Sequence, residues 1–211
     1  MEISVRHTFK DIIGTSCDAD FDVIQIICET LPDDAKVLEV GSLFGKSAVG
    51  FAECLEEKGG IITTIDMFLG ITNAGPHPED ADDAFFEWLS QIACDAEEHK
   101  KRFDKYTKGW SNIHSVQTFF DPQTYQLNEK IDLFYWSGLH DFDSTYNGIR
   151  WAYDNVKDGG YICIAAGTNH VESYRAVTTL AEERMLSVVN PTGSTISIMI
   201  KNKQGWKLKN L

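Results

Sequence analysis

The residue types best suited to bind a ligand gather in one short segment near position 40. In V-L-E-V-G-S-L-F-G-K-S (37–47), an apolar run carries one acid and leads into two glycines and then a helix-forming stretch. Gly41 and Gly45 allow a tight turn and a close approach of the backbone to a ligand. Asp66 ends the next apolar run, I-I-T-T-I, where its carboxylate can accept hydrogen bonds from two hydroxyl groups. A strand, a glycine turn and a helix N-terminus together form a nucleotide-binding corner.

Three kinds of site compete for this glycine segment. A phosphate-binding P-loop reads G-x-x-x-x-G-K-[ST], but three residues instead of four separate Gly41 from Gly45, and Ser137 stands where a magnesium-binding aspartate would follow the fourth strand. A dinucleotide site reads G-x-G-x-x-G, and the middle glycine is missing here. S-adenosylmethionine (SAM) has no phosphate, so the turn has only to pass close to its amino-acid end while Asp66 binds the ribose hydroxyls. The spacing favours SAM.

Apolar periodicity and chain breakers place these residues on alternating strands and helices. Alternating βα units imply a parallel sheet with helices on both faces, and the short N-P-T-G connection at 190–193 indicates a closing hairpin. The predicted fold is therefore α/β, a doubly wound, mostly parallel seven-stranded sheet with a C-terminal antiparallel hairpin. We expect helices over 18–31, 45–57, 80–106, 144–156 and 170–184, and strands over 36–40, 61–65, 112–117, 131–136, 161–165, 185–189 and 195–201.

The chain is expected to form a single domain over 1–211, because no linker or repeat divides it. The segment 67–110 is long for a connection between two parallel strands and is a candidate lid over the binding crevice. Phe86 and Trp88 within it are candidates for a lid or for a dimer contact, so a homodimer is among the expected assemblies.

Composition narrows the class of partner. The formal net charge of -13 opposes a phosphate backbone, so we expect no nucleic-acid partner. No apolar run approaches the roughly 20 residues that span a membrane, and the N-terminus lacks the apolar core of a signal peptide. The five cysteines are scattered without a C-x-x-C pair, which argues against a zinc knuckle or a disulfide framework. We therefore expect a cytoplasmic protein that acts on a small molecule.

Four motifs together resemble those of a known family. They are E-V-G-S-L-F-G-K-S (39–47), I-D-M-F-L-G (65–70), I-D-L-F-Y-W-S-G-L-H-D-F (131–142) and V-K-D-G-G-Y-I-C-I (156–164). Over roughly residues 35–200 the chain resembles the class I SAM-dependent methyltransferases. It is most similar to the small-molecule O-methyltransferases typified by macrocin O-methyltransferase, with a more distant likeness to catechol O-methyltransferase. The resemblance implies a Rossmann-like fold and SAM as cofactor.

The resemblance also implies which residues contact the cofactor. Those expected around its methionine part are Glu39, Gly41, Ser42, Gly45 and Ser47. Asp66 would hold the ribose and Met67 would lie against the adenine. Gln117 and Thr118 occupy the place of a polar contact to the adenine, and Ser137 follows the fourth strand at the same edge.

The catalytic end departs from the family pattern. Similar sequences read D-G-D-H-S-Y after the fourth strand and D-D after the fifth, and in the metal-using branch these acids help to bind a divalent cation. Here Ser137 and Leu139 replace the first two acids and Ala165-Ala166 replaces the last pair, so we expect no metal. His140 remains at the family's histidine position, where it is a candidate general base or a structural residue.

Other polar and aromatic residues are assigned from position alone. His170 is expected to have a helix-capping or surface role, and the histidines expected on the surface are His7, His77, His99 and His114. The aromatic candidates for an apolar acceptor pocket are Phe119, Phe120, Tyr135, Trp136 and Phe142. The leading hypothesis is SAM-dependent methyl transfer to a hydroxyl of a small molecule without a metal. The alternative is a SAM-binding protein of the same fold that has lost transfer activity.

Overall fold

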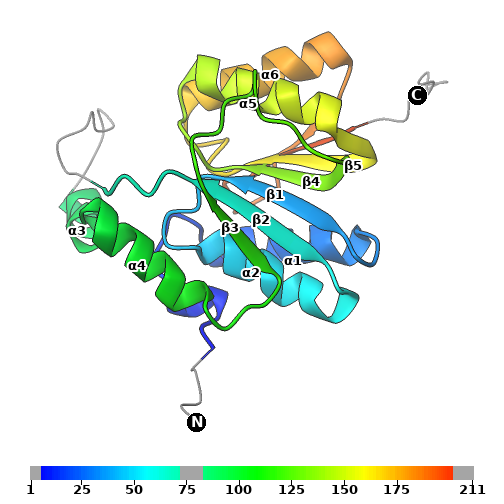
Figure 1. The fold of residues 1–211 in the computed structure, drawn as a ribbon. Helices are drawn as coiled ribbons and strands as arrows, with labels where there is room; N and C mark the ends of the chain where they lie inside the picture. Colours follow the sequence, from blue (N-terminus) through cyan, green and yellow to red (C-terminus); the bar gives the residue numbers. More distant parts are fainter. Residues whose placement is uncertain (1–5, 72–82, 202–211) are drawn as a thin grey trace.

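The computed structural model describes residues 6–71 and 83–201 of the 211-residue chain. Helices and strands alternate through most of this part (Figure 1). The helical elements are η1 (Phe9–Asp11), α1 (Asp18–Thr30), α2 (Lys46–Leu55), η2 (Glu56–Lys58), α3 (Asp83–Ile92), α4 (Ala96–Thr107), α5 (Phe142–Asn155) and α6 (Val171–Arg184). The strands are β1 (Lys36–Val40), β2 (Ile61–Asp66), β3 (Ile113–Gln117), β4 (Ile131–Trp136), β5 (Val156–Ile164), β6 (Val188–Val189) and β7 (Ser197–Ile200).

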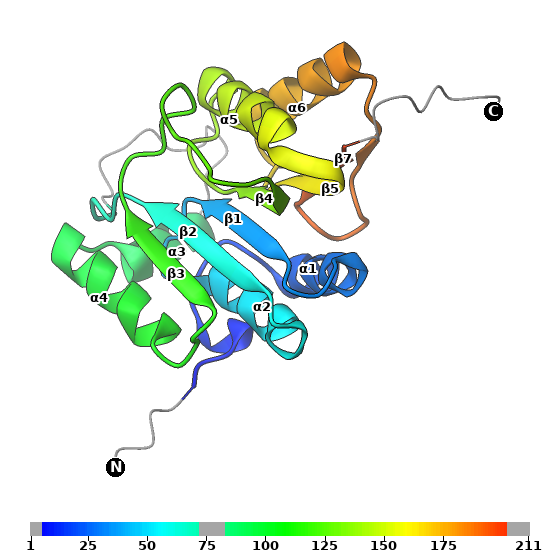
Figure 2. The same ribbon diagram turned by 45° about the vertical axis from the view of Figure 1, so that its right-hand side comes forward.

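The strands form one seven-stranded sheet in the order β3-β2-β1-β4-β5-β7-β6. Strands β1 to β5 pair in parallel, and β7 pairs antiparallel with both β5 and β6. The predicted fold class is therefore confirmed. The chain builds outward from β1 to β3 on one side and then returns to place β4 on the other side of β1 (Figure 2). The reversal between β1 and β4 leaves a crevice beyond the ends of these strands, where ligands of open α/β sheets bind.

Helices cover both faces of the sheet, with α1 and α2 on one face and α5 and α6 on the other (Figures 1 and 2). Strand β4 shows how the sequence achieves this arrangement, because all six of its residues are buried. Leu133 and Tyr135 belong to the core beneath α1 and α2, while Phe134 and Trp136 belong to the core beneath α5 and α6. Apolar residues on both sides of a strand are what a two-sided parallel sheet requires.

The prediction of one long helix over 80–106 is wrong. Two helices, α3 and α4, fill the described part of this range, and the chain is extended between them at Cys94. The amide of Ile71 donates to the carbonyl of Cys94 (2.8 Å), and the amide of Cys94 donates back (3.0 Å). Asp95 then begins α4 by accepting a hydrogen bond from the amide of Glu98. The first residues of the predicted range, 80–82, lie outside the described residues.

Three smaller boundary predictions are wrong. The strand predicted over 161–165 begins earlier, because residues 156–160 form the first part of β5. The strand expected over 185–189 is reduced to β6, because Met185 ends α6 in the left-handed conformation (φ 53°). The helix predicted over 144–156 begins two residues earlier, because Asp141 caps α5 by accepting a hydrogen bond from the amide of Ser144. Within the described residues, no helix has both the length and the apolar character needed to cross a bilayer.

Candidate functional site

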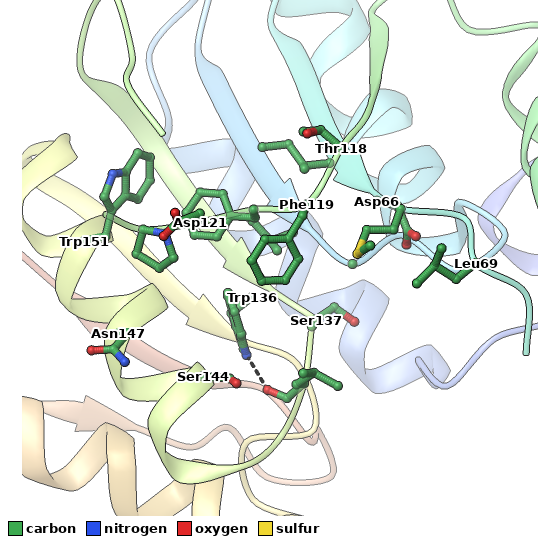
Figure 3. Close-up of a pocket in the computed structure, with 18 of the residues that line it drawn as sticks. Asp66, Leu69, Thr118, Phe119, Asp121, Trp136, Ser137, Ser144, Asn147 and Trp151 are labelled. Carbon is green, nitrogen blue, oxygen red and sulfur yellow. Dashed lines mark hydrogen bonds between the residues drawn. The ribbon is translucent and has the colours of Figure 1, made fainter. Parts of the chain in front are cut away.

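A cavity of about 830 Å³ opens at the edge of the sheet where the strand order reverses. This volume lies within the usual range of small-molecule sites. Its floor is formed by the ends of three neighbouring strands, through Val40, Gly41, Ile65, Asp66, Trp136 and Ser137. In Figure 3, Phe119 lies in the middle of the lining, with Asp66 and Leu69 towards one end and Asn147 and Trp151 towards the other.

The glycine turn has the geometry for which the sequence analysis required glycine. Gly41 has a φ of 85° and Gly45 a φ of 87°, in the left-handed region that side chains disfavour. A Cβ atom on Gly41 would lie 2.2 Å from the carbonyl oxygen of Ser137. Gly41 also lines the cavity, so its missing side chain lets the backbone of β1 and of β4 meet at the cavity floor.

Asp66 joins the end of β2 to the glycine turn. Its Oδ2 accepts hydrogen bonds from the amides of Ser42 (2.8 Å) and Leu43 (3.3 Å), and its Oδ1 accepts one from the amide of Phe68 (2.7 Å). A carboxylate offers about four lone-pair directions, so one remains for a ligand donor. Asp66 therefore shapes the turn and also lines the cavity.

Glu39 lies on the face of β1 towards α2 and is fully buried. Its carboxyl group accepts hydrogen bonds from the hydroxyls of Ser47 on α2 and Thr64 on β2. Burial raises the pKa of Glu39 to about 7, although these hydroxyls oppose the shift. Glu39 thus holds β1, β2 and α2 together beneath the glycine turn. Neither Glu39 nor Ser47 is part of the cavity lining.

The remaining predicted contacts divide into two groups. Met67, Thr118 and Ser137 line the cavity together with Gly41 and Asp66. Three do not reach it, namely Ser42, Gly45 and Gln117, and the Gln117 side chain instead donates from Nε2 to the carbonyl of Met67 (3.4 Å). The structure therefore brings five of the predicted cofactor residues into one cavity.

His140 lies beside the cavity, outside its lining. Its ring stacks on the ring of His170, with centroids 4.3 Å apart and planes 2° from parallel. Nδ1 lies 3.3 Å from Oγ of Ser173, and that hydroxyl donates to the carbonyl of His140 (3.0 Å). We therefore assign the proton to Nδ1, which leaves Nε2 as the basic atom. Burial and the neighbouring His170 lower the pKa of His140 to about 4, so the ring is neutral at pH 7.

The expectation that His99 lies on the surface is wrong. It is 5% exposed and lines the cavity from α4. Sequence reasoning missed it because the break before α4 places this helix against the glycine turn. The periodic spacing of apolar residues in the sequence could not reveal that contact.

The aromatic candidates for the acceptor pocket fall into two groups, one that lines the cavity and one that does not. Phe119, Phe120 and Trp136 line the cavity. Tyr135 is buried on the opposite face of β4, where its ring meets that of Phe51 (5.2 Å), and Phe142 stacks on Tyr146 (5.6 Å). Tyr135 and Phe142 therefore contribute to the packing of the protein and do not line the cavity. Sequence reasoning did not identify Asp143, Ser144 and Asn147, which form a polar wall from α5.

The ends of β4 and β5 carry no carboxylates at the positions where the sequence analysis looked for a metal. Ser137 and Leu139 follow β4, and Leu139 is 67% exposed. Ala165 and Ala166 follow β5, and Ala166 has a φ of 49°. Within residues 6–71 and 83–201, no group of three or more His, Cys, Asp or Glu side chains is arranged to hold a metal ion.

Comparison with known families gives one match. Residues 38–164 match the model of a family described as "Methyltransferase domain", a span that covers more than half of the chain. It includes the glycine turn, Asp66 and the ends of β4 and β5. No match was found among curated proteins.

Several solved structures share the fold at low sequence identity. The O-methyltransferase NovP is 16% identical, with a TM-score of 0.60 over 87% of this chain and 79% of that one. The N-methyltransferase NodS from Bradyrhizobium japonicum WM9 is 15% identical, with a TM-score of 0.53 over 87% and 94%. An O-methyltransferase from Bacillus cereus in complex with SAH is 14% identical, with a TM-score of 0.53 over 90% and 84%. At this identity the likeness shows the fold alone.

Proposed function

The chain belongs to the methyltransferase-domain family, and from that premise we propose that it transfers the methyl group of SAM to a hydroxyl of a small molecule without a metal. One observation carries the proposal. The cavity at the strand reversal is lined both by Gly41, which begins the glycine turn, and by Asp66, the acid expected to bind the ribose. The absence of a Cβ on Gly41 lets the backbone at Ser137 approach β1, and this approach forms the part of the cavity floor on which a ligand would rest.

The residues around the cavity fit SAM in size and in chemistry. A volume of about 830 Å³ holds a nucleoside with room for a second small molecule. The free lone pair of Asp66 suits a ribose hydroxyl, and the exposed side chains of Met67 and Phe119 supply apolar surface for a flat base. When bound, SAM supplies an electrophilic methyl group that passes to the acceptor oxygen as the methyl–sulfur bond breaks.

A hydroxyl acceptor is favoured by two further observations. The sequence resembles macrocin-type O-methyltransferases, and the α5 side of the cavity offers Asp143, Ser144 and Asn147 as hydrogen-bonding groups for a polar acceptor. A net charge of -13 supports a small molecule over a nucleic acid as acceptor. Serine, leucine and alanine at the ends of β4 and β5 supply no carboxylate for a divalent cation, which supports transfer without a metal.

In this proposal the protein aligns the acceptor oxygen with the methyl group of SAM and supplies a base for the acceptor proton. Holding the acceptor oxygen in line with the methyl group can supply about 7–11 kcal/mol of the barrier reduction. His140 lies beside the cavity and outside its lining, so in this proposal the neutral ring takes the acceptor proton at Nε2 through one bridging water molecule. Because its pKa is about 4, the ring stays in the basic form from neutral pH down to about that value.

Isothermal titration calorimetry tests the cofactor. We expect SAM and S-adenosylhomocysteine to bind, and ATP with magnesium not to bind. The variant Gly41→Ala should lose SAM binding, because its Cβ would lie 2.2 Å from the carbonyl oxygen of Ser137 on the cavity floor. Binding of ATP with magnesium in the absence of SAM binding would exclude the proposal.

Turnover is tested by S-adenosylhomocysteine release against a panel of hydroxylated small molecules. We expect acceptor-dependent release that is unchanged by EDTA and about a hundredfold slower in kcat for His140→Gln. His114→Gln, at an exposed position on β3, is the control and should match the unsubstituted protein. Activity that EDTA abolishes would refute transfer without a metal, and an unchanged kcat for His140→Gln would remove its role as base.

The second candidate is a SAM-binding protein without transfer activity. The observation that favours it is the replacement of every usual acid at the ends of β4 and β5 by Ser137, Leu139, Ala165 and Ala166. SAM binding without S-adenosylhomocysteine release across the whole panel would support this candidate over the first.

A further inference from the structure

His99 lies at the junction of three segments that border the cavity. Its ring meets Phe44 of the glycine turn edge to face (centroids 5.6 Å apart, planes at 89°) and Phe68 after β2 in the same way (5.2 Å, 78°). Its Nε2 lies 3.0 Å from the carbonyl oxygen of Leu43. The ring therefore connects α4 to both loops that shape the cofactor end of the cavity.

The contact with Leu43 determines which ring nitrogen of His99 is the donor. A carbonyl oxygen can only accept, so Nε2 must carry the proton that it donates to Leu43. In the neutral ring Nδ1 is then an acceptor with one lone pair. Nδ1 of His99 is buried and has no hydrogen-bond partner among the residues that the structure describes. A buried acceptor is more stable when it is paired, so a ligand donor placed at this atom would be bound favourably.

The backbone around His99 is also held away from its preferred conformation. Leu43 has a φ of 48° and Phe68 a φ of 50°, and both residues contact the His99 side chain. Non-glycine residues in the left-handed region are uncommon and gather at ligand sites. An unpaired buried acceptor and two strained neighbours thus occur together, beside a cavity that is large enough for a ligand.

We infer that Nδ1 of His99 accepts a hydrogen bond from an N–H or O–H donor of the cofactor, directly or through one water molecule. The inference rests on the proposed function, in which the cofactor is SAM. Its ammonium group and its ribose hydroxyls are donors of the required kind, whereas its carboxylate and its sulfonium sulfur cannot pair with an acceptor. His99 is thus a cofactor-binding residue on α4, outside the four motifs that carry the family resemblance.

Two isosteric variants separate this role from a structural one. The amide of Gln in His99→Gln reaches the position of Nε2, so it can keep the bond to Leu43 but offers no acceptor at Nδ1. The amide of Asn in His99→Asn reaches the position of Nδ1, so it can keep that acceptor but loses the bond to Leu43. Binding of SAM is measured by calorimetry without an acceptor, and stability by thermal unfolding of the free proteins.

We expect His99→Gln to bind SAM about tenfold more weakly without a loss of free-protein stability, because one ligand hydrogen bond is missing. We expect His99→Asn to keep near-normal affinity and to unfold at a lower temperature. Equal affinity of His99→Gln and the unsubstituted protein would overturn the inference and leave the proposed function intact. If His99→Gln fails to fold, a tenfold loss of affinity in His99→Asn would overturn it equally. No SAM binding by the unsubstituted protein would instead overturn the proposed function.

Discussion

Replacing Asp66 with alanine is expected to weaken SAM binding by about ten- to hundredfold. The carboxylate has two tasks, and alanine performs neither. It fixes the glycine turn through the amides of Ser42, Leu43 and Phe68, and its remaining lone pair faces a ribose hydroxyl in the proposed complex. Calorimetry with SAM gives the affinity, and unchanged binding by Asp66→Ala would refute the assignment.

The two tasks of Asp66 can be separated with a ligand that lacks the ribose hydroxyls. In the unsubstituted protein, a 2′,3′-dideoxy analogue of S-adenosylhomocysteine should bind more weakly than S-adenosylhomocysteine itself. In Asp66→Ala this difference should shrink, because the hydroxyls no longer have their acceptor. An equal penalty in both proteins would mean that Asp66 acts only by holding the turn.

Replacing Glu39 with glutamine is expected to remove a pH-dependent loss of stability of about 3 kcal/mol. Burial raises the pKa of Glu39 from its ordinary value near 4.5 to about 7, so the folded protein holds this proton more tightly than the unfolded chain. Stability is therefore unaffected by this group below about pH 4.5 and falls as the pH rises towards 7. Urea unfolding of both proteins between pH 4 and pH 8 measures the difference in free energy of unfolding.

Glu98 provides a control, because its effect on stability should change with pH in the direction opposite to that of Glu39. Its side chain accepts a hydrogen bond from Arg102, which lowers the pKa of Glu98. Glu98→Gln should therefore lose stability relative to the unsubstituted protein at neutral pH, and the difference should vanish as the pH falls. If the free-energy difference between Glu39→Gln and the unsubstituted protein stays constant with pH, the buried carboxyl group does not titrate as its surroundings indicate.

The order and type of the strands could be predicted because each strand carries its own signal. The apolar runs of β1, β2 and β4 are buried on both faces, and the glycines that follow β1 have the positive φ angles that the turn requires. Asp66 was identifiable for the same reason, since its role depends on its place at the end of a strand. Local pattern and tertiary position agree at these residues.

Residues whose role depends on contacts far away in the sequence could not be identified in this way. The interruption between α3 and α4 comes from pairing of Cys94 with Ile71, and the apolar spacing of the helix continues through it. His99 became a cavity residue only because of that interruption. The resemblance assigned Glu39 to the cofactor, and that assignment stays a prediction. In the structure its carboxyl group bonds Ser47 and Thr64 outside the cavity lining, a set of contacts that the sequence did not indicate.

The paired backbone hydrogen bonds between Ile71 and Cys94 hold the two ends of the intervening segment together. This pairing does not depend on the length of the segment. Doubling the number of residues in such a closed loop costs only about 0.6 kcal/mol in conformational entropy. Leu89 and Ile92 near the end of this segment are buried in the core, so a change in the segment's length or sequence that keeps these two side chains should leave the pairing of β2 with β3 in register. A segment grafted from another protein between Ile71 and Cys94 would therefore have to supply these core contacts for the sheet and the glycine turn to stay in place.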